Sequence, residues 1–291
     1  YKIINQIMRL GASPDWKRQR FTLDKDMSDA VNFTFIELFQ KGLIYKDKRL
    51  VNWDPHLKTA ISDLEVVQKE VDGCLWYINY PIKDSKETIT IATTRPETMF
   101  GDTAIAVHPS DNRYADMIGK DVIIPIIGRS IKIITDEYAD PEQGSGAVKI
   151  TPAHDFNDFE VGKRNNLEML SILDIDGKLN ENVDKEWQGL DRFEARSKLL
   201  KILSEEGYLV KEEKYNNSVP HGDRSDVIIE PYLTEQWYVD AKTLAKPALD
   251  SVKSGDMKFI PPNWSKTYYE WLENIQPWCI SRQLWWGHRI P

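Results

Sequence analysis

The 291-residue sequence has only two cysteines, Cys74 and Cys279, which stand far apart and form no Cys-x-x-Cys pair. This scarcity argues against a disulfide framework and against a cysteine zinc site, so a reducing compartment is expected. Long apolar runs are also missing, since no stretch reaches the roughly 18 consecutive apolar residues that a membrane-spanning helix needs. The composition therefore predicts a cytoplasmic protein with no membrane partner.

Net positive charge is missing as well, because the formal net charge is −8. An acidic balance argues only weakly against nucleic-acid binding, since a local basic stripe is enough to hold phosphate groups. The sequence begins at Tyr1 instead of a methionine, and its start carries no secretory or transit signature. We interpret the chain as a fragment.

Hydrophobic periodicity predicts helices over residues 3–11 and about 26–42, and further helices from near Asp155 and over about 191–206. Short β-type runs dominate the middle of the chain, at 75–80, 88–93, 103–108, 122–134 and 147–151. Regular helices do not separate these strands, so a doubly wound parallel sheet is not expected. The predicted fold class is α+β, with a closed or twisted β-barrel and helices packed outside it.

A first candidate site segment, residues 93–98, reads TTRPET and follows one of the β-type runs. Sites are often built where a chain turns at the mouth of a sheet. The hydroxyls of Thr93, Thr94 and Thr98 and the guanidinium of Arg95 suit a ribose, a phosphate or a polar carbonyl. An equally good alternative is that Thr94 caps a short helix and Glu97 closes a capping box.

A second candidate segment, residues 144–160, reads GSGAVKITPAHDFNDFE. Its glycines let backbone approach a ligand, a strand brings in Lys149, and a proline starts the turn into a helix. Asp155 and Asp158 share a face of that helix and could bind an ammonium group or orient a water molecule. The alternative is structural: Asp155 is the N-cap, and Asp158 complements the helix dipole.

Other kinds of site are poorly supported. His108, His154, Asp155 and Asp158 are residue types that bind metals, but their spacing matches no zinc motif, so no metal is expected. No serine stands in a Gly-x-Ser-x-Gly elbow, and the glycines of residues 144–146 lack the rest of a nucleotide-binding fingerprint. The tryptophan-rich end, 278–291, could hold a nucleotide or form core.

At these segments the chain resembles class I aminoacyl-tRNA synthetases of the valine, isoleucine and leucine group, and most closely the valine enzymes. Residues 93–98 match the group's editing signature, and 149–158 resemble the second editing segment of valine enzymes. The likeness spans nearly the whole chain, through residues 52–55, 223–225, 229–231, 235–237 and 278–291. Isoleucine enzymes usually carry a cysteine-bearing segment where this chain has 220–225, so valine is favoured.

The resemblance implies three parts: an N-terminal flank at 1–55, an editing domain at 56–234, and a C-terminal flank at 235–291. The flanks would belong to the interrupted nucleotide-binding domain. The family's two ATP signatures are absent from this sequence, so this chain is not expected to aminoacylate. ATP and magnesium would serve the full-length enzyme, which ligates valine to tRNA(Val), whereas editing would need no cofactor.

The implied reaction is hydrolysis of threonine wrongly attached to tRNA(Val), with pre-transfer editing as an additional possibility. A pocket for valine rejects near-isosteric threonine poorly, an established limit for valine enzymes, so a second hydrolytic site is needed. The implied partners are the tRNA(Val) acceptor end and mischarged threonine, without a stable protein partner. The catalytic set would be Asp155, Asp158 and Lys149; the substrate-binding set would be Thr93, Thr94, Arg95, Thr98, Thr151 and His154.

In this hypothesis Asp158 receives the ammonium group, while Asp155 tests the side-chain hydroxyl or orients water, and the two roles could be exchanged. Arg95 and Lys149 would bind phosphate, ribose or carbonyl oxygens, and a positioned water would attack the ester. Three rival readings remain: a non-catalytic insertion that binds the tRNA acceptor end, the editing domain of an isoleucine or leucine enzyme, and metal-dependent hydrolysis.

Overall fold

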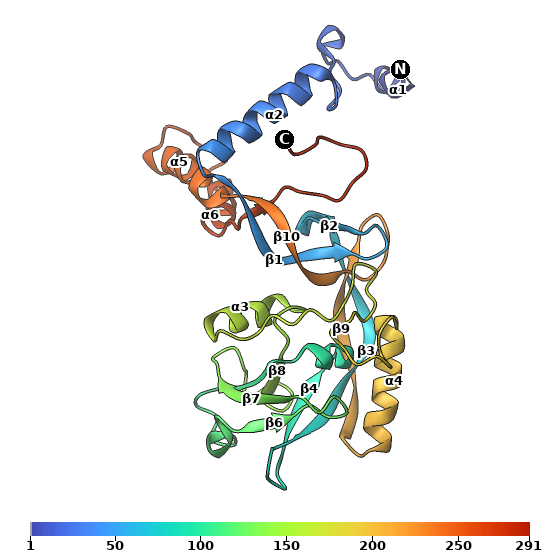
Figure 1. Ribbon diagram of the computed structural model, residues 1–291. Helices are drawn as coiled ribbons and strands as arrows, with labels where there is room; N and C mark the ends of the chain where they lie inside the picture. The colour runs from blue at the N-terminus through green and yellow to red at the C-terminus, as the bar shows by residue number, and fades with distance from the viewer. Residues whose placement is uncertain (1) are drawn as a thin grey trace. The chain divides into compact units, whose positions relative to one another are not determined.

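The computed structural model describes residues 2–291 and divides into two compact units. The flanking unit combines the chain up to Lys46 with the chain from Trp237 onward, and the central unit is Asp47–Gln236. Two strands, β1 (Ile44–Asp54) and β10 (Glu230–Val239), run across the boundaries between them (Figure 1).

The flanking unit is mainly helical. Its helices are α1 (Lys2–Arg9), the short 3₁₀ helix η1 (Trp16–Arg18), α2 (Lys25–Gln40), α5 (Ala241–Ser254) and α6 (Trp264–Glu273). Aromatic packing links its two chain segments, because the ring of Trp237 contacts the rings of Phe35 and Phe39 at 5.5 and 6.0 Å. Strand β11 (Trp278–Cys279) pairs antiparallel with the end of β10. The predicted helices over 3–11 and about 26–42 are confirmed, whereas α5 and α6 were not predicted.

Helix α5 begins at a well-formed cap that gives a simple stability prediction. The Asp240 carboxylate accepts hydrogen bonds from the backbone N–H of Thr243 at 3.1 Å and from its hydroxyl at 2.6 Å. Replacing Asp240 by Ala is expected to lower the free energy of unfolding by about 1 kcal/mol, measured by urea unfolding followed by circular dichroism. Asp250→Ala, at an exposed position of the same helix, serves as the control and should change stability by less than about 0.5 kcal/mol.

The central unit holds most of the strands, in open sheets. They are β1, β2 (Thr59–Ile61), β3 (Val66–Pro81), β4 (Thr88–Thr93), β5 (Ala104–Val107), β6 (Asp121–Ile123), β7 (Ser130–Thr135), β8 (Ala147–Ile150), β9 (Leu209–Gly222) and β10. One sheet has the order β4-β3-β9 and another the order β6-β7-β5-β8, in which only the β5–β7 pair is parallel. The third sheet has the order β11-β10-β1-β2, and within it β1 and β2 pair antiparallel.

Strand β5 shows why these sequences form strands. Its residues are all buried, and because side chains alternate across a strand, Ile105 and Val107 enter one core while Ala104 and Ala106 enter another. The second core includes Val161 of helix α3 (Phe156–Arg164). Strand β5 is therefore covered on both faces, and its two small alanines let the α3 side approach closely.

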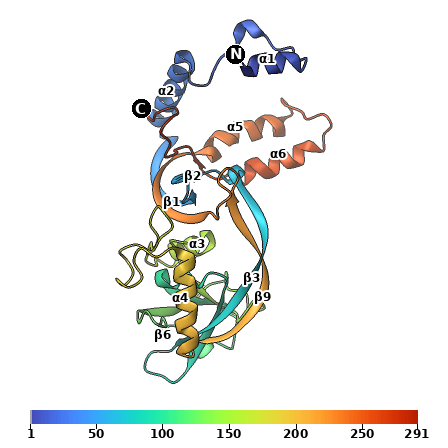
Figure 2. The same ribbon diagram turned by 90° about the vertical axis from the view of Figure 1, so that its right-hand side faces the viewer.

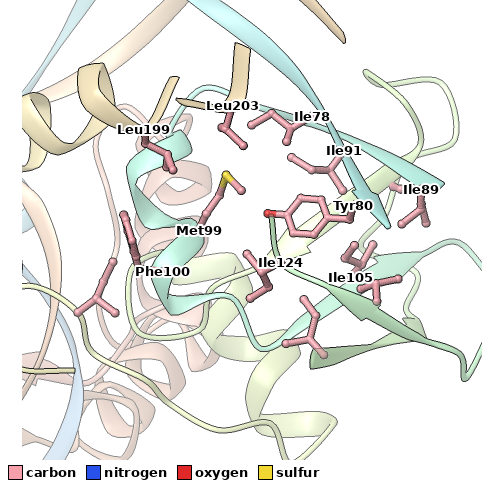
Figure 3. Close-up of a cluster of buried hydrophobic side chains, with 14 of the residues drawn as sticks. Ile78, Tyr80, Ile89, Ile91, Met99, Phe100, Ile105, Ile124, Leu199 and Leu203 are labelled. Atoms are coloured by element: carbon pink, nitrogen blue, oxygen red, sulfur yellow. The ribbon is translucent and has the colours of Figure 1, made fainter. Parts of the chain in front are cut away.

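The main core lies between the β4-β3-β9 sheet, the β6-β7-β5-β8 sheet and helix α4 (Arg192–Glu205). Figure 3 shows Ile78, Tyr80 and Ile91 from the β3–β4 sheet converging with Met99 and with Leu203 of α4. All five are buried. In both ribbon views α4 lies alongside the long β3–β9 ribbon (Figures 1 and 2). This packing fixes the end of β4, where the first candidate segment begins.

The expected closed barrel is not formed. The sheets β4-β3-β9 and β6-β7-β5-β8 each have two edge strands, and a single bridge between Ile82 and Val122 joins them. Closure requires a continuous ladder of backbone hydrogen bonds, and β6 has only three residues with which to supply one. The mixed α and β content is as predicted.

Candidate functional site

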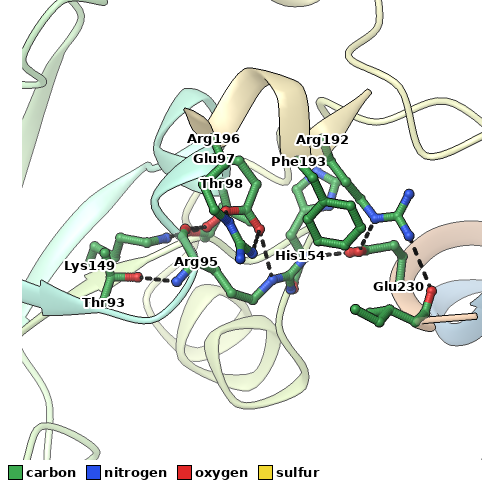
Figure 4. Close-up of polar contacts among 12 residues, drawn as sticks. Thr93, Arg95, Glu97, Thr98, Lys149, His154, Arg192, Phe193, Arg196 and Glu230 are labelled. Carbon is green, nitrogen blue, oxygen red and sulfur yellow. Dashed lines mark hydrogen bonds and ion pairs between the residues drawn. The ribbon is translucent and has the colours of Figure 1, made fainter. Parts of the chain in front are cut away.

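The fold brings together the two segments singled out in the sequence. Residues 93–98 pass from the last residue of β4 into the 3₁₀ helix η3 (Pro96–Gly101), and residues 149–158 pass from β8 into α3. The Lys149 ammonium donates to the Thr98 hydroxyl at 2.6 Å, which joins the segments directly. Figure 4 shows this contact beside a row of charged side chains.

Lys149 is buried, and three protein oxygens surround its ammonium group. Besides Thr98, the nitrogen donates to the Thr151 hydroxyl at 2.5 Å and to the Asp102 carboxylate at 3.0 Å. An ammonium group has three N–H donors, so these contacts use all of them. Lys149 thus orients two threonine hydroxyls in this structure and has no donor left over for a ligand.

Asp102 is the site residue that sequence reasoning missed. Its carboxylate is fully buried and accepts from the Thr151 hydroxyl at 2.6 Å and from the Tyr80 hydroxyl at 2.7 Å, in addition to Lys149. Burial, followed by the charge of Asp102, raises the pKa of Tyr80 well above its usual range. The only signal in the sequence was an acidic residue directly after Gly101, in a segment that otherwise reads as a turn.

The N-terminus of α3 carries both candidate carboxylates, in different environments. Asp155 is the N-cap, and its Oδ1 accepts from the backbone N–H groups of Asn157 at 2.8 Å and Asp158 at 3.1 Å, so the structural alternative for this residue is confirmed. Asp158 is buried, and its Oδ2 accepts from the backbone N–H of Thr151 at 2.8 Å. Burial, followed by the charge of Asp155, raises the pKa of Asp158 to about 7.

These contacts leave Asp158 Oδ1 and Asp155 Oδ2 without a hydrogen-bond partner among the described residues. Tyr138 stands close to both carboxylates. Burial, followed by the charges of Asp158 and Asp155, raises its pKa to about 12. A cationic group placed between the two carboxylates would relieve their mutual repulsion, so this end of α3 suits an ammonium ligand.

The start of η3 differs from the predicted capping box. The N-cap position is held by Arg95 rather than Thr94, and no side chain makes the cap hydrogen bond. Thr93 instead accepts from the backbone N–H of Arg95 at 3.0 Å, while Glu97 turns toward arginine side chains. The Thr94 side chain is half-buried. The spacing of Thr94 and Glu97 predicted a capping box, but ion pairs with Arg95 and Arg196 decide the orientation of the Glu97 side chain.

Arg95 lies between two buried carboxylates. Its Nε donates to Glu97 at 3.3 Å, its Nη1 to the backbone carbonyl of His154 at 2.9 Å, and its Nη2 to Glu230 (Figure 4). Burial opposes the charged form, but the charges of Glu230 and Glu97 prevail and raise the pKa of Arg95. Glu97 is itself clamped by Arg196 at 2.7 and 2.8 Å, and hydrogen bonding from Arg196 lowers its pKa in spite of burial.

His154 has a structural position within the fold. It is fully buried, and its Nε2 accepts from the backbone N–H of Ile172 at 2.8 Å. Burial, followed by the charges of Arg95 and Lys149, lowers the pKa of His154 to about 3, so the ring is neutral at physiological pH. Its backbone carbonyl, rather than its ring, contacts Arg95.

Within residues 2–291, no group of three or more His, Cys, Asp or Glu side chains is arranged to hold a metal ion. No helix in the described part of the chain is long and apolar enough to cross a membrane.

Comparison with known proteins identifies the family. The family model for class I tRNA synthetases of the I, L, M and V group matches residues 1–291. The chain belongs to this family. It is 63% identical to the valine--tRNA ligase of Pelagibacter ubique and 57% identical to that of Caulobacter vibrioides, in each case over 99% of this chain. It covers 33% and 34% of those two ligases, so it spans about a third of their length.

One solved structure gives a weak structural likeness. The LeuRS-tRNA-LeuAMS ternary complex of Agrobacterium radiobacter K84 aligns with a TM-score of 0.39 and 19% sequence identity. The alignment covers 78% of this chain and 39% of that one.

Proposed function

We propose that this chain hydrolyses threonine from mischarged tRNA(Val) in an editing reaction. The observation that supports it is the pair of carboxylates at the start of α3, one buried and one capping, beside threonine hydroxyls that a buried lysine orients. The similarity to valine--tRNA ligases adds to this proposal. The full-length protein would ligate valine to tRNA(Val) with ATP and magnesium.

In this mechanism Asp158 receives the substrate's ammonium group on Oδ1. Burial raises the pKa of Asp158 to about 7, so its negative charge is poorly compensated in the free protein. A bound ammonium group would compensate that charge and favour the ionised carboxylate. Asp155 Oδ2 would test the threonine hydroxyl or orient the attacking water. No covalent nucleophile takes part, since the aminoacyl ester is already activated and water attacks its carbonyl.

The remaining residues would hold the ester and the terminal adenosine. Thr93, Thr94 and Arg95 supply hydroxyl and N–H groups at the end of β4, where Arg95 is about a quarter exposed. Lys149 would act through Thr98 and Thr151, because its own donors are committed to them and to Asp102. Valine would be spared because it leaves pocket groups unpaired, at a cost of about 1–3 kcal/mol.

The direct test follows release of amino acid from Thr-tRNA(Val) and Val-tRNA(Val) by this chain, with and without a chelator. We expect threonine to be released at least about 10-fold faster than valine, because about 1.4 kcal/mol of discrimination corresponds to a tenfold ratio. The chelator should have no effect. Equal release of both amino acids would contradict the proposed specificity. Tight binding without hydrolysis would favour an insertion that only positions the acceptor end.

A further inference from the structure

Glu230 belongs to the sequence Ile229-Glu230-Pro231, to which the proposed reaction gives no role. It is buried at the start of β10, and each of its carboxylate oxygens meets a different arginine. Oε2 accepts from Arg95 Nη2, and Oε1 lies 2.7 Å from Arg192 Nε. Figure 4 shows Glu230 and Arg192 beside His154 at one end of the charged row.

The row of charged side chains continues from Arg95 to Glu97 and Arg196, and so returns to helix α4, which also carries Arg192. Glu97 contacts Arg95 and is held by Arg196, which stands four residues after Arg192 on α4. Residues four apart share one face of a helix. The order Arg192, Glu230, Arg95, Glu97, Arg196 is therefore a loop of alternating charges that begins and ends on one face of α4.

Both ends of this loop are stiffened by aromatic packing. The guanidinium carbons of Arg192 and Arg196 lie 4.4 and 5.2 Å from the centre of the Phe193 ring. Stacked guanidinium groups of this kind keep a defined plane. The exposed fractions of the two glutamate side chains, 1% for Glu97 and 4% for Glu230, show that water does not compete for their oxygens.

The geometry leaves part of Arg95 available to a ligand. A guanidinium group has five N–H donors, and the contacts to Glu97, His154 and Glu230 use three of them. Arg95 can therefore donate to an oxygen atom of a ligand, while Glu97, His154 and Glu230 hold its guanidinium group in a fixed plane.

We propose that Glu230 is a positioning residue for the editing reaction, which aims Arg95 by holding it between β10 and the arginines of α4. This inference rests on the proposed function. Glu230 itself touches no substrate and acts through Arg95.

The kinetic test compares Glu230→Gln, Arg95→Gln and the double variant in hydrolysis of Thr-tRNA(Val). Glu230→Gln keeps the shape but loses the charge, and misplacing a binding group can reduce activity on the order of 100-fold. We expect Glu230→Gln to change the same kinetic parameter, kcat or KM, as Arg95→Gln, and the double variant to lose no more than Arg95→Gln alone. Multiplying losses, or wild-type activity of Glu230→Gln, would overturn the proposal.

A matched control and a second variant separate positioning from general stability. Glu213→Gln removes a carboxylate of an exposed pair with Lys211 on β9 and should leave kcat/KM within about twofold of wild type. If Glu230→Gln does not fold, Arg192→Lys keeps the positive charge while removing the Nε contact to Glu230. Arg192→Lys should reduce hydrolysis by a smaller factor, and it should cause no further reduction when Arg95 is already replaced by Gln.

A spectroscopic measurement tests the same contact without activity. In ¹⁵N-labelled protein, hindered rotation of the Arg95 guanidinium should give resolved Nη signals, which should merge in Glu230→Gln and persist in Glu213→Gln. Merged signals in the wild-type protein would contradict the positioning role whether or not the chain hydrolyses tRNA. Resolved wild-type signals that merge in Glu230→Gln, together with an inactive wild type, would leave the positioning intact and reject the proposed function.

Discussion

Replacing Asp158 by Asn is expected to reduce hydrolysis of Thr-tRNA(Val) at least about 100-fold while making the chain more stable above pH 7. Asparagine keeps the shape and can still accept from the Thr151 backbone N–H, the contact that Asp158 makes at 2.8 Å. It cannot supply the negative charge that a substrate ammonium group would need. Wild-type hydrolysis by Asp158→Asn would remove Asp158 from the ammonium-binding role.

The stability gain follows from the pKa of Asp158, which burial and Asp155 raise from 3.8 to about 7. Below pH 3.8 the group is protonated in both folded and unfolded chains and contributes no difference. As pH rises from 3.8 to about 7, the unfolded chain releases its proton first, so the folded state loses relative stability. Above pH 7 the full penalty is present, and it is on the order of 4 kcal/mol at about 1.4 kcal/mol per pKa unit.

The measurement is urea unfolding of wild type and Asp158→Asn between pH 4 and 8. The difference in unfolding free energy should grow with pH and level off above about pH 7. Glu160→Gln provides the control, because Glu160 is an exposed acidic residue on the same helix. Parallel stability curves for wild type and Asp158→Asn would show that Asp158 ionises in the folded chain as readily as in water.

Replacing Asp102 by Asn is expected to destabilise the central unit by about 3 kcal/mol, a larger loss than any surface charge would give. The Asp102 carboxylate is fully buried with the Lys149 ammonium at 3.0 Å, and removing one partner of a buried pair leaves the other charge uncompensated. Hydrolysis should fall as well, since the Lys149 ammonium and the Thr151 hydroxyl would then donate to a neutral amide oxygen instead of a carboxylate.

Denaturant unfolding with a matched surface variant provides the test. Asp121 pairs with Lys132 at 2.9 Å, but both side chains are exposed, so Asp121→Asn should cost no more than about 1 kcal/mol. Equal losses for Asp102→Asn and Asp121→Asn would contradict a buried, charge-dependent role for Asp102. The contrast compares two aspartate–lysine pairs that differ chiefly in their access to water.

Local patterns predicted many elements because their causes lie within a few residues. Strand β4 was expected at 88–93 and spans Thr88–Thr93, where alternating burial places Ile89 and Ile91 in the core. The start of α3 was expected near Asp155, because an aspartate can satisfy the free N–H groups of the first turn. Helix α5 was missed, since Pro247 interrupts its helical pattern in the sequence.

Arrangements that depend on distant partners could not be predicted in the same way. A closed or twisted barrel was expected because regular helices do not separate the strands, but whether sheet edges meet depends on pairing between distant segments, to which β6 contributes only three residues. The contacts of the folded chain divide it after Lys46 and after Gln236, within strands β1 and β10. The length of a strand, and the residue at which its contacts pass from one unit to the other, depend on the folded chain.

The sequence by itself determined the family resemblance, the two candidate segments and the residue types available to a site, because these follow from local order along the chain. Only the tertiary structure decided which polar groups are used in contacts within the protein and which remain free to bind a ligand. Glu230 reaches Arg95 across 135 positions of sequence, and Asp102 reaches Lys149 across 47. Buried charges must find partners wherever the fold supplies them, and that requirement leaves no local pattern in the sequence.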